Sequence, residues 1–210
     1  MAKTTHHDYV GELYAQIQQR PLPLPTYILY AAQMVAILQC LRNAGVVHRD
    51  FKPENLMINL QGHLVLVDFG SARWLHGDGS TAPAADGSTH AGGISPTENT
   101  TTSSFVGTAE YTAPETLAGR PPTAALDLWA LGCVLFQLLT GVPPFKGPTE
   151  FATFERITSG EYKLPNDVDA RAADVVRRLL VTDPGARLGS TSLEEVMAHP
   201  LFDGIEWEGL

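Results

Sequence analysis

Residues 48–55 of this chain are HRDFKPEN, and residues 68–70 are DFG. Between them lie two short apolar segments, 56–60 and 63–67, joined by a Gln-Gly pair that is typical of a hairpin turn. A hairpin folds the residues before it back toward the residues after it. The two polar motifs are therefore expected to lie together in the fold.

The polar side chains of these motifs suit phosphoryl transfer to a hydroxyl group. This chemistry needs a carboxylate to accept the proton and orient the hydroxyl, oxygen ligands for Mg²⁺, and a cation near the moving phosphate. Asp50 is the candidate carboxylate and Lys52 the candidate cation. Asn55 and Asp68 are the candidate metal ligands, because Mg²⁺ prefers a few protein oxygens together with phosphate oxygens.

These motifs resemble the catalytic loop and the DFG motif of protein kinases, and Ala113-Pro114-Glu115 resembles the motif that closes the kinase activation segment. One such motif would be weak, but three in this order and spacing are specific. Phe51 stands where the family usually has Leu. The resemblance implies ATP and Mg²⁺ as cofactors. It also implies protein substrates with Ser or Thr, because Lys52 and a catalytic Thr108 match the serine/threonine kinases.

Other segments resemble the 3-phosphoinositide-dependent protein kinases of the AGC group. The resemblance covers about residues 9–207, apart from 75–103, and implies that Ser104 is an activation-loop phosphosite whose phosphate pairs with Arg49. The alternative for Ser104, an ordinary serine in a Thr/Ser-rich run, stays open. No pleckstrin-homology segment is seen before the chain ends, so phosphoinositide binding is not expected of this chain. The matching segments are SFVGTAEY (104–111), DLWALGC (127–133), PPF (143–145), RLG (187–189) and HPLF (199–202) with Trp207.

The resemblance also implies residues that shape the site. Asp127 is expected to anchor the catalytic-loop backbone from a long central helix, and Glu115 to form a buried ion pair with Arg187. His48 is expected to order the loop against Phe69. The structural set is His48, Arg49, Phe69, Gly70, Glu115, Asp127 and Arg187.

Two further positions match nucleotide contacts. Glu12 resembles the residue that contacts the ATP ribose, although a solvated carboxylate at a helix start is an equal alternative. Met57 resembles the floor under the adenine, although core packing alone would also explain it. With Asn55 and Asp68, they complete the predicted cofactor-binding set.

The expected fold class is mainly α with one small β-hairpin, as in the C-terminal lobe of a protein kinase. Apolar periodicity predicts helices over 11–19, 26–43, 124–140, 149–158, 170–181 and to about 199. Before His48 the only lysine is Lys3 and no G-x-G-x-x-G occurs, so the N-terminal β-lobe is expected to be absent. The predicted domain is 9–207, with tails at 1–8 and 208–210.

Residues 75–103 differ from the rest, because they are small and polar with no apolar period. They are predicted to form a disordered insert in the activation segment.

The composition narrows the class of protein. A net charge of −9 argues against a nucleic-acid binder, which usually carries a basic face. The first 11 residues contain no apolar signal segment, and the apolar stretches 27–41 and 126–139 are short for a membrane span. Cys40 and Cys133 are far apart and suggest neither a disulfide nor a zinc site. A cytoplasmic or nuclear location is expected.

Two hypotheses of different class follow. The first is an ATP-dependent serine/threonine kinase that is incomplete in this chain. The second is a catalytically inactive kinase-like lobe that acts as a binding or regulatory module. The intact Asp50, Lys52, Asn55 and Asp68 favour the first, and the expected lack of an N-terminal lobe favours the second.

Overall fold

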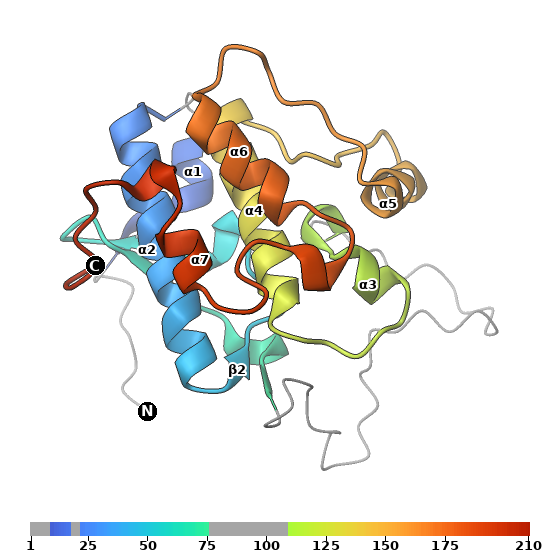
Figure 1. Ribbon diagram of the computed structural model, residues 1–210, viewed down its shortest axis with the longest axis horizontal. Helices are drawn as coiled ribbons and strands as arrows, with labels where there is room; N and C mark the ends of the chain where they lie inside the picture. Colours follow the sequence, from blue (N-terminus) through green and yellow to red (C-terminus); the bar gives the residue numbers. More distant parts are fainter. Residues whose placement is uncertain (1–8, 18–21, 76–108) are drawn as a thin grey trace.

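The computed structural model describes residues 9–17, 22–75 and 109–210. Its centre is helix α4 (Ala125–Thr140), in which every residue from Ala125 to Leu138 is buried. Helices α2 (Leu24–Asn43) and α6 (Ala170–Leu179) pack against α4 and cover it (Figure 1). An apolar helix of this kind is stable only when neighbours surround it, which explains its place at the centre.

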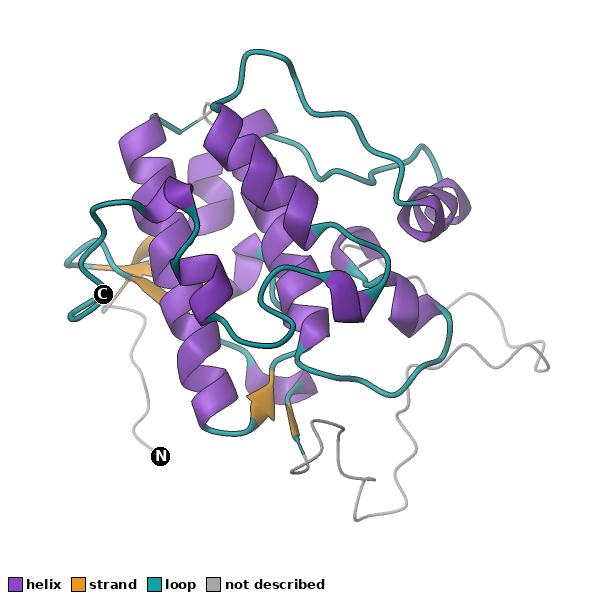
Figure 2. Cartoon of the chain, in the orientation of Figure 1, coloured by secondary structure: helices purple, strands orange, loops and turns teal. Residues whose placement is uncertain are grey.

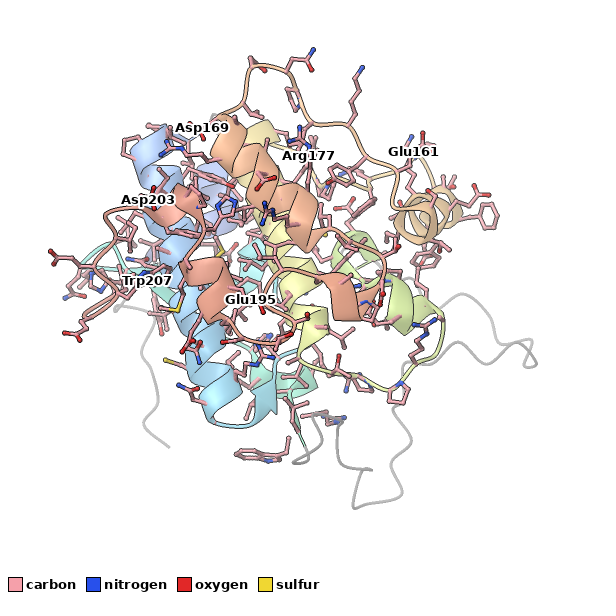
Figure 3. The ribbon with its side chains drawn as sticks, in the orientation of Figure 1. Glu161, Asp169, Arg177, Glu195, Asp203 and Trp207 are labelled. Carbon is pink, nitrogen blue, oxygen red and sulfur yellow. The ribbon has the colours of Figure 1, made fainter. Side chains whose placement is uncertain are left out.

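Helix α6 shows how the sequence positions such a neighbour. Its buried residues include Ala172, Val175, Val176 and Leu179, which lie on one helical face. Arg177 is exposed on the outer side, and Asp169 caps the first turn by accepting hydrogen bonds from two backbone N–H groups (Figure 3). The other helices are α1 (Leu13–Ile17), α3 (Pro114–Leu117), α5 (Glu150–Ser159), α7 (Glu194–Met197) and the 3-10 helices η1 (Pro53–Asn55), η2 (Phe69–Ser71), η3 (Ala109–Tyr111), η4 (Pro184–Ala186) and η5 (Pro200–Phe202).

Within the described residues, two small antiparallel sheets lie beside the helices (Figure 2). The first has the order β1 (Tyr9–Glu12), β3 (Leu56–Asn59) and β4 (Leu64–Leu66). The second pairs β2 (Val46–Val47) with β5 (Arg73–Trp74). The predicted hairpin is therefore present as β3 and β4, but the prediction of a single hairpin was wrong.

The helix predicted over 11–19 was wrong at its start. Residues up to Glu12 belong to strand β1, which pairs with β3, and the helix is confined to Leu13–Ile17 within the described part of the chain. A strand of this length is too short to show a clear alternation, and its partner lies more than forty positions away in the sequence. Tertiary pairing decided the conformation here.

Helix α2 starts at Leu24, two residues before the predicted Thr26. Pro25 fits in the first turn because no helical hydrogen bond is required of its nitrogen there. By length and composition α2 could cross a membrane, contrary to the expectation that this stretch is too short. In the fold, 44% of that apolar window is buried, and a single helix of this kind is weak evidence for a span.

The predicted insert 75–103 lies outside the described residues except at Leu75. The Leu75 N–H donates to the Gly45 carbonyl at 2.7 Å and continues the pairing of β2 with β5. Leu75 also packs against the core, so the boundary of the insert falls after this residue.

Glycine at 132 allows α4 and α6 to approach closely. A Cβ atom built there would lie 2.9 Å from the Leu179 Cβ and 2.8 Å from a Leu180 methyl carbon. We expect Gly132→Ala to destabilise the fold by about 1–3 kcal/mol, because the helices must move apart. Urea unfolding would measure this cost. Gly11→Ala is the control, since nothing lies within 4 Å of its Cβ position; equal costs for the two variants would contradict the prediction.

Candidate active site

The Asp127 side chain anchors the loop between β2 and η1. This side chain projects from α4, and its two carboxylate oxygens accept hydrogen bonds from the backbone N–H of His48 at 2.7 Å and of Arg49 at 2.9 Å. Burial raises the pKa of Asp127, and the two N–H donors oppose that rise. Arg49 has a left-handed φ of 71°, which this double anchor stabilises. Asp127 therefore lies where the sequence predicted an anchor.

Asp50 lies at the centre of the loop with one of its oxygens engaged. Its Oδ2 is 2.8 Å from the Lys52 Nζ and accepts a hydrogen bond from the Asn55 Nδ2 at 2.9 Å. The same Asn55 amide also donates to the Asp50 carbonyl at 2.8 Å. The Asp50 Oδ1 is buried and has no hydrogen-bond partner among the described residues. The loop thus fixes the carboxylate and leaves one acceptor oxygen available.

The hairpin brings Asp68 back to this loop. The Val67 N–H donates to the Asn55 carbonyl at 2.9 Å, so Asp68 follows directly on a residue bonded to Asn55. Asp68 has a left-handed φ of 60°, and its Oδ1 accepts a hydrogen bond from the Gly70 N–H at 3.2 Å. The DFG motif therefore turns sharply beside the catalytic loop, as the spacing predicts.

His48 connects the two motifs. Its Nε2 lies 3.2 Å from the Val67 carbonyl oxygen, and its ring packs edge-on against Phe69 with centroids 5.0 Å apart. Phe69 itself is about half exposed. His48 is fully buried and positions the loop, which is the role expected from the sequence.

The donor set at Asn55 and Asp68 fits Mg²⁺ only with help from a bound phosphate. The Asn55 side-chain nitrogen donates both of these hydrogen bonds, so the side-chain oxygen remains a possible Mg²⁺ ligand. Asp68 retains a second carboxylate oxygen. No group of three His, Cys, Asp or Glu side chains that could hold a metal occurs in the described part of the chain. Two protein oxygens are what Mg²⁺ uses when substrate phosphates supply other ligands.

Glu12 and Met57 lie opposite each other in the first sheet. Glu12 at the end of β1 pairs with Met57 of β3, and Met57 pairs in turn with Val65 of β4. Glu12 is exposed, whereas Met57 and Val65 are half-buried. The structure brings this pair together beside Asn55, which immediately precedes β3.

Two predicted residues, Ser104 and Thr108, lie outside the described residues. Arg49, the predicted partner of a Ser104 phosphate, is described, and burial together with the nearby Arg73 guanidinium lowers its pKa. Arg73 was missed by the sequence analysis. Its position shortly after the DFG motif is the signal that could have indicated it. The β2–β5 pairing places Arg73 opposite Val47, two residues before Arg49.

Glu54 is a second residue that the sequence analysis missed. Burial raises the pKa of its carboxyl group, and the negative charges of Asp50 and Glu110 add to the rise, while Lys52 opposes it. Its Oε2 is buried without a partner in the described structure. The catalytic loop and η3 therefore lie side by side, although they are far apart in the sequence.

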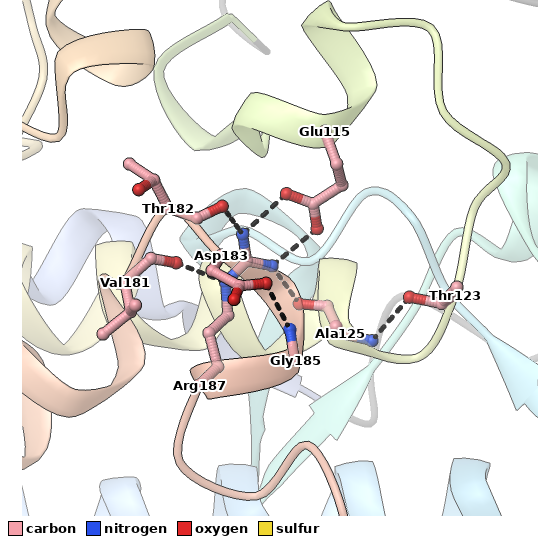
Figure 4. A network of polar contacts seen from close by, with 8 residues as sticks. All are labelled: Glu115, Thr123, Ala125, Val181, Thr182, Asp183, Gly185 and Arg187. Atoms are coloured by element: carbon pink, nitrogen blue, oxygen red, sulfur yellow. Dashed lines mark hydrogen bonds and ion pairs between the residues drawn. The ribbon is translucent and has the colours of Figure 1, made fainter.

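The predicted ion pair between Glu115 and Arg187 is present and buried (Figure 4). The two guanidinium NH groups donate to the two carboxylate oxygens of Glu115 at 2.6 Å each. Arg187 also donates to the carbonyl oxygens of Val181 and Ala125, both at 2.8 Å. Its guanidinium carbon lies 5.0 Å from the centroid of the Trp129 ring. This network fixes α3 against α4 below the site.

Comparison with known proteins agrees with this geometry. The family described as "Protein kinase domain" matches residues 5–202. The chain is 39% identical to 3-phosphoinositide-dependent protein kinase 1 of Rattus norvegicus over 86% of this chain and 30% of that protein. It is 38% identical to the Arabidopsis thaliana protein of the same name over 95% of this chain and 39% of that protein.

A third relative is serine/threonine-protein kinase ksg1 of Schizosaccharomyces pombe, 38% identical over 85% of this chain and 29% of the relative. The chain thus spans about a third of the length of these curated relatives. The matched domain covers the catalytic loop, the hairpin and the helices around α4 alike. The chain belongs to the protein kinase domain family.

Proposed function

We propose that this protein is a serine/threonine protein kinase that transfers the γ-phosphate of ATP to hydroxyl groups of protein substrates. The arrangement of Asp50 carries this proposal. One of its oxygens is held by Lys52 and Asn55, and the other is left without a partner among the described residues. A carboxylate fixed in this way can accept the proton of a serine or threonine hydroxyl.

The side chains around Asp50 then have distinct tasks. Lys52 holds the carboxylate and places a positive charge near the phosphate that is transferred. The predicted Thr108 would bond both Asp50 and Lys52. Asn55 and Asp68 would hold Mg²⁺, and Glu12 and Met57 would contact the ribose and adenine. Bound ATP·Mg²⁺ supplies the phosphoryl group and charge neutralisation. Support for this assignment comes from the hydrogen bonds that join the loop and the hairpin.

We further propose that residues 9–207 correspond to the C-terminal lobe of the kinase domain. The sheet of β1, β3 and β4 would form one side of a nucleotide site, at Glu12 and Met57. Residues 9–17, 22–75 and 109–210 contain no G-x-G-x-x-G sequence, and those before the catalytic loop contain no lysine. Full activity is therefore expected to need a glycine-rich loop and a phosphate-binding lysine in addition to these residues. If they are never supplied, the alternative of an inactive binding module applies.

A transfer assay with labelled ATP tests the proposed function. The full-length protein is expected to label serine and threonine, but not tyrosine, in a generic protein substrate, and EDTA is expected to abolish the labelling. Residues 1–210 alone are expected to transfer phosphate poorly, since each tenfold loss of rate corresponds to about 1.4 kcal/mol of barrier. Strong Mg²⁺-dependent transfer by 1–210 alone would contradict the need for a second lobe. No transfer by the full-length protein would contradict the kinase proposal.

A further inference from the structure

Arg42 is a half-buried cation in the last turn of helix α2, and it has no task in the active site described above. Its Nη1 donates to the Gly189 carbonyl oxygen at 2.7 Å. Its Nη2 donates to the carbonyl oxygens of Ser190 at 2.7 Å and Thr191 at 3.3 Å. A guanidinium that donates to several acceptors is fixed in both position and orientation. Arg42 therefore bridges the end of α2 to a distant turn of the chain.

That turn, residues 187–191, is itself firmly held. The Gly189 N–H donates to the Glu195 Oε2 at 3.1 Å, so both backbone polar groups of Gly189 are bonded to side chains. At the start of the turn, Arg187 donates to the Ala125 carbonyl oxygen of α4 at 2.8 Å. The turn is thus a fixed point to which the beginning of α4 is already bound.

The bridge lies directly before the catalytic loop in the chain. The Gly45 N–H donates to the Arg42 carbonyl oxygen at 3.0 Å and turns the chain out of α2 into β2. His48 follows β2 at once, and its N–H is bonded to Asp127 in the first turn of α4. Asp127 lies two positions after Ala125, the residue whose carbonyl is bound from the turn. Arg42 and Asp127 thus hold the two ends of one short stretch of chain.

Side-chain packing leaves a small pocket between these two anchors. Arg42 and Asp127 both line it, and the rest of its lining is apolar and comes from α2, β2, α4 and the residues before α7. Apolar contacts across an incompletely filled space constrain the distance between two elements less than close packing does. The hydrogen bonds of Arg42 therefore set the separation between the end of α2 and the start of α4.

We propose that Arg42 is a positioning residue for the proton acceptor: by holding the end of α2 to residues 187–191, it fixes the start of the catalytic loop opposite Asp127 and thereby the place of Asp50. The consequence for catalysis rests on the proposed kinase function, whereas the bridge itself does not depend on activity. Without the bridge the loop is anchored from one side only. A displacement of about 1 Å in a catalytic group can cost about 100-fold in rate.

Hydrogen exchange of the full-length protein tests the bridge. Arg42→Met keeps an apolar stem but removes the donors, and the amides of His48 and Arg49 are expected to exchange about tenfold faster. Arg42→Lys keeps the charge without the planar fork and should fall between. Arg156→Met is the matched control, because Arg156 also lies in the last turn of a helix, α5, and donates to the Lys146 carbonyl oxygen at 2.5 Å. That control should leave both amides unchanged.

Kinetics on the full-length protein test the consequence, with labelled ATP and myelin basic protein as substrates. Arg42→Met is expected to lower kcat about tenfold, with both KM values within twofold of the unmodified protein, because the change acts on the proton acceptor through the loop. Arg42→Lys should recover part of kcat, and Arg156→Met should stay within twofold. Rates are expressed per folded molecule, with the folded fraction taken from circular dichroism at the assay temperature, so that a loss of stability alone does not lower kcat.

Unchanged exchange of His48 and Arg49 in Arg42→Met overturns the bridge as an anchor of the loop. A kcat within twofold of the unmodified protein, or an equal fall of kcat in Arg156→Met, overturns the positioning role. If the unmodified full-length protein transfers no phosphate, the proposed function fails and with it the consequence for catalysis, while the exchange experiment still decides the bridge.

Discussion

Asp50→Asn is expected to reduce phosphoryl transfer by the full-length protein about 100- to 10,000-fold, the usual contribution of a positioned proton acceptor. The amide is nearly the same size as the carboxylate but is a far weaker base. It also loses the charge that pairs with the Lys52 Nζ at 2.8 Å. Initial rates with labelled ATP at saturating substrate measure the effect.

The control for this substitution is Asp167→Asn, an exposed carboxylate on the connection that precedes α6. Its rate should stay within twofold of the unmodified protein. The thermal midpoint of the Asp50→Asn protein should also stay close to that of the unmodified protein. A residual rate above one third of the original, with the fold intact, would remove Asp50 from the role of proton acceptor.

Arg187→Ala is expected to lower the free energy of unfolding by about 3–5 kcal/mol, because it leaves the Glu115 charge buried without a partner. A typical domain is stable by only about 5–15 kcal/mol, so much of the protein should unfold in mild denaturant. The side chains of the pair are 0% and 3% exposed, which excludes solvent as a substitute partner. Urea unfolding followed by circular dichroism measures the loss.

Arg178→Ala serves as the matched control for Arg187→Ala. Arg178 pairs with Asp174 at 2.9 Å, but its side chain is 58% exposed, so about 1 kcal/mol or less is expected. The double variant Arg187→Met/Glu115→Leu should recover part of the lost stability, because no charge is then stranded. Similar midpoints for Arg187→Ala and Arg178→Ala would show that the pair contributes no more than a surface contact.

The sequence predicts local features of this fold better than pairings between distant segments. Helix α4 is apparent from its apolar run, and β3 with β4 from the two short apolar segments around the Gln-Gly pair at 61–62, because both signals are local. The last two residues of strand β1 were assigned to a helix, since only the pairing with β3 makes them part of a strand. The short β2–β5 pair escaped notice for the same reason.

The candidate site shows the same division. Asp50, Asn55 and Asp68 could be identified because short motifs with fixed spacing carry them. Arg73 was missed, because its significance depends on Arg49, which is far away in the sequence and is brought near by the β2–β5 pairing. The roles of Ser104 and Thr108 remain predictions.

The burial of α4 has a consequence for synthesis on the ribosome. Helix α4 emerges well before α6 and before Arg187, whose side chain bonds the Ala125 carbonyl at the start of α4. For that interval the nascent chain holds an apolar helix that α2 and η3 can contact but that α6 cannot yet cover. Chaperone binding to this helix during translation is therefore expected, and it should end once the α6 segment and Arg187 have left the exit tunnel.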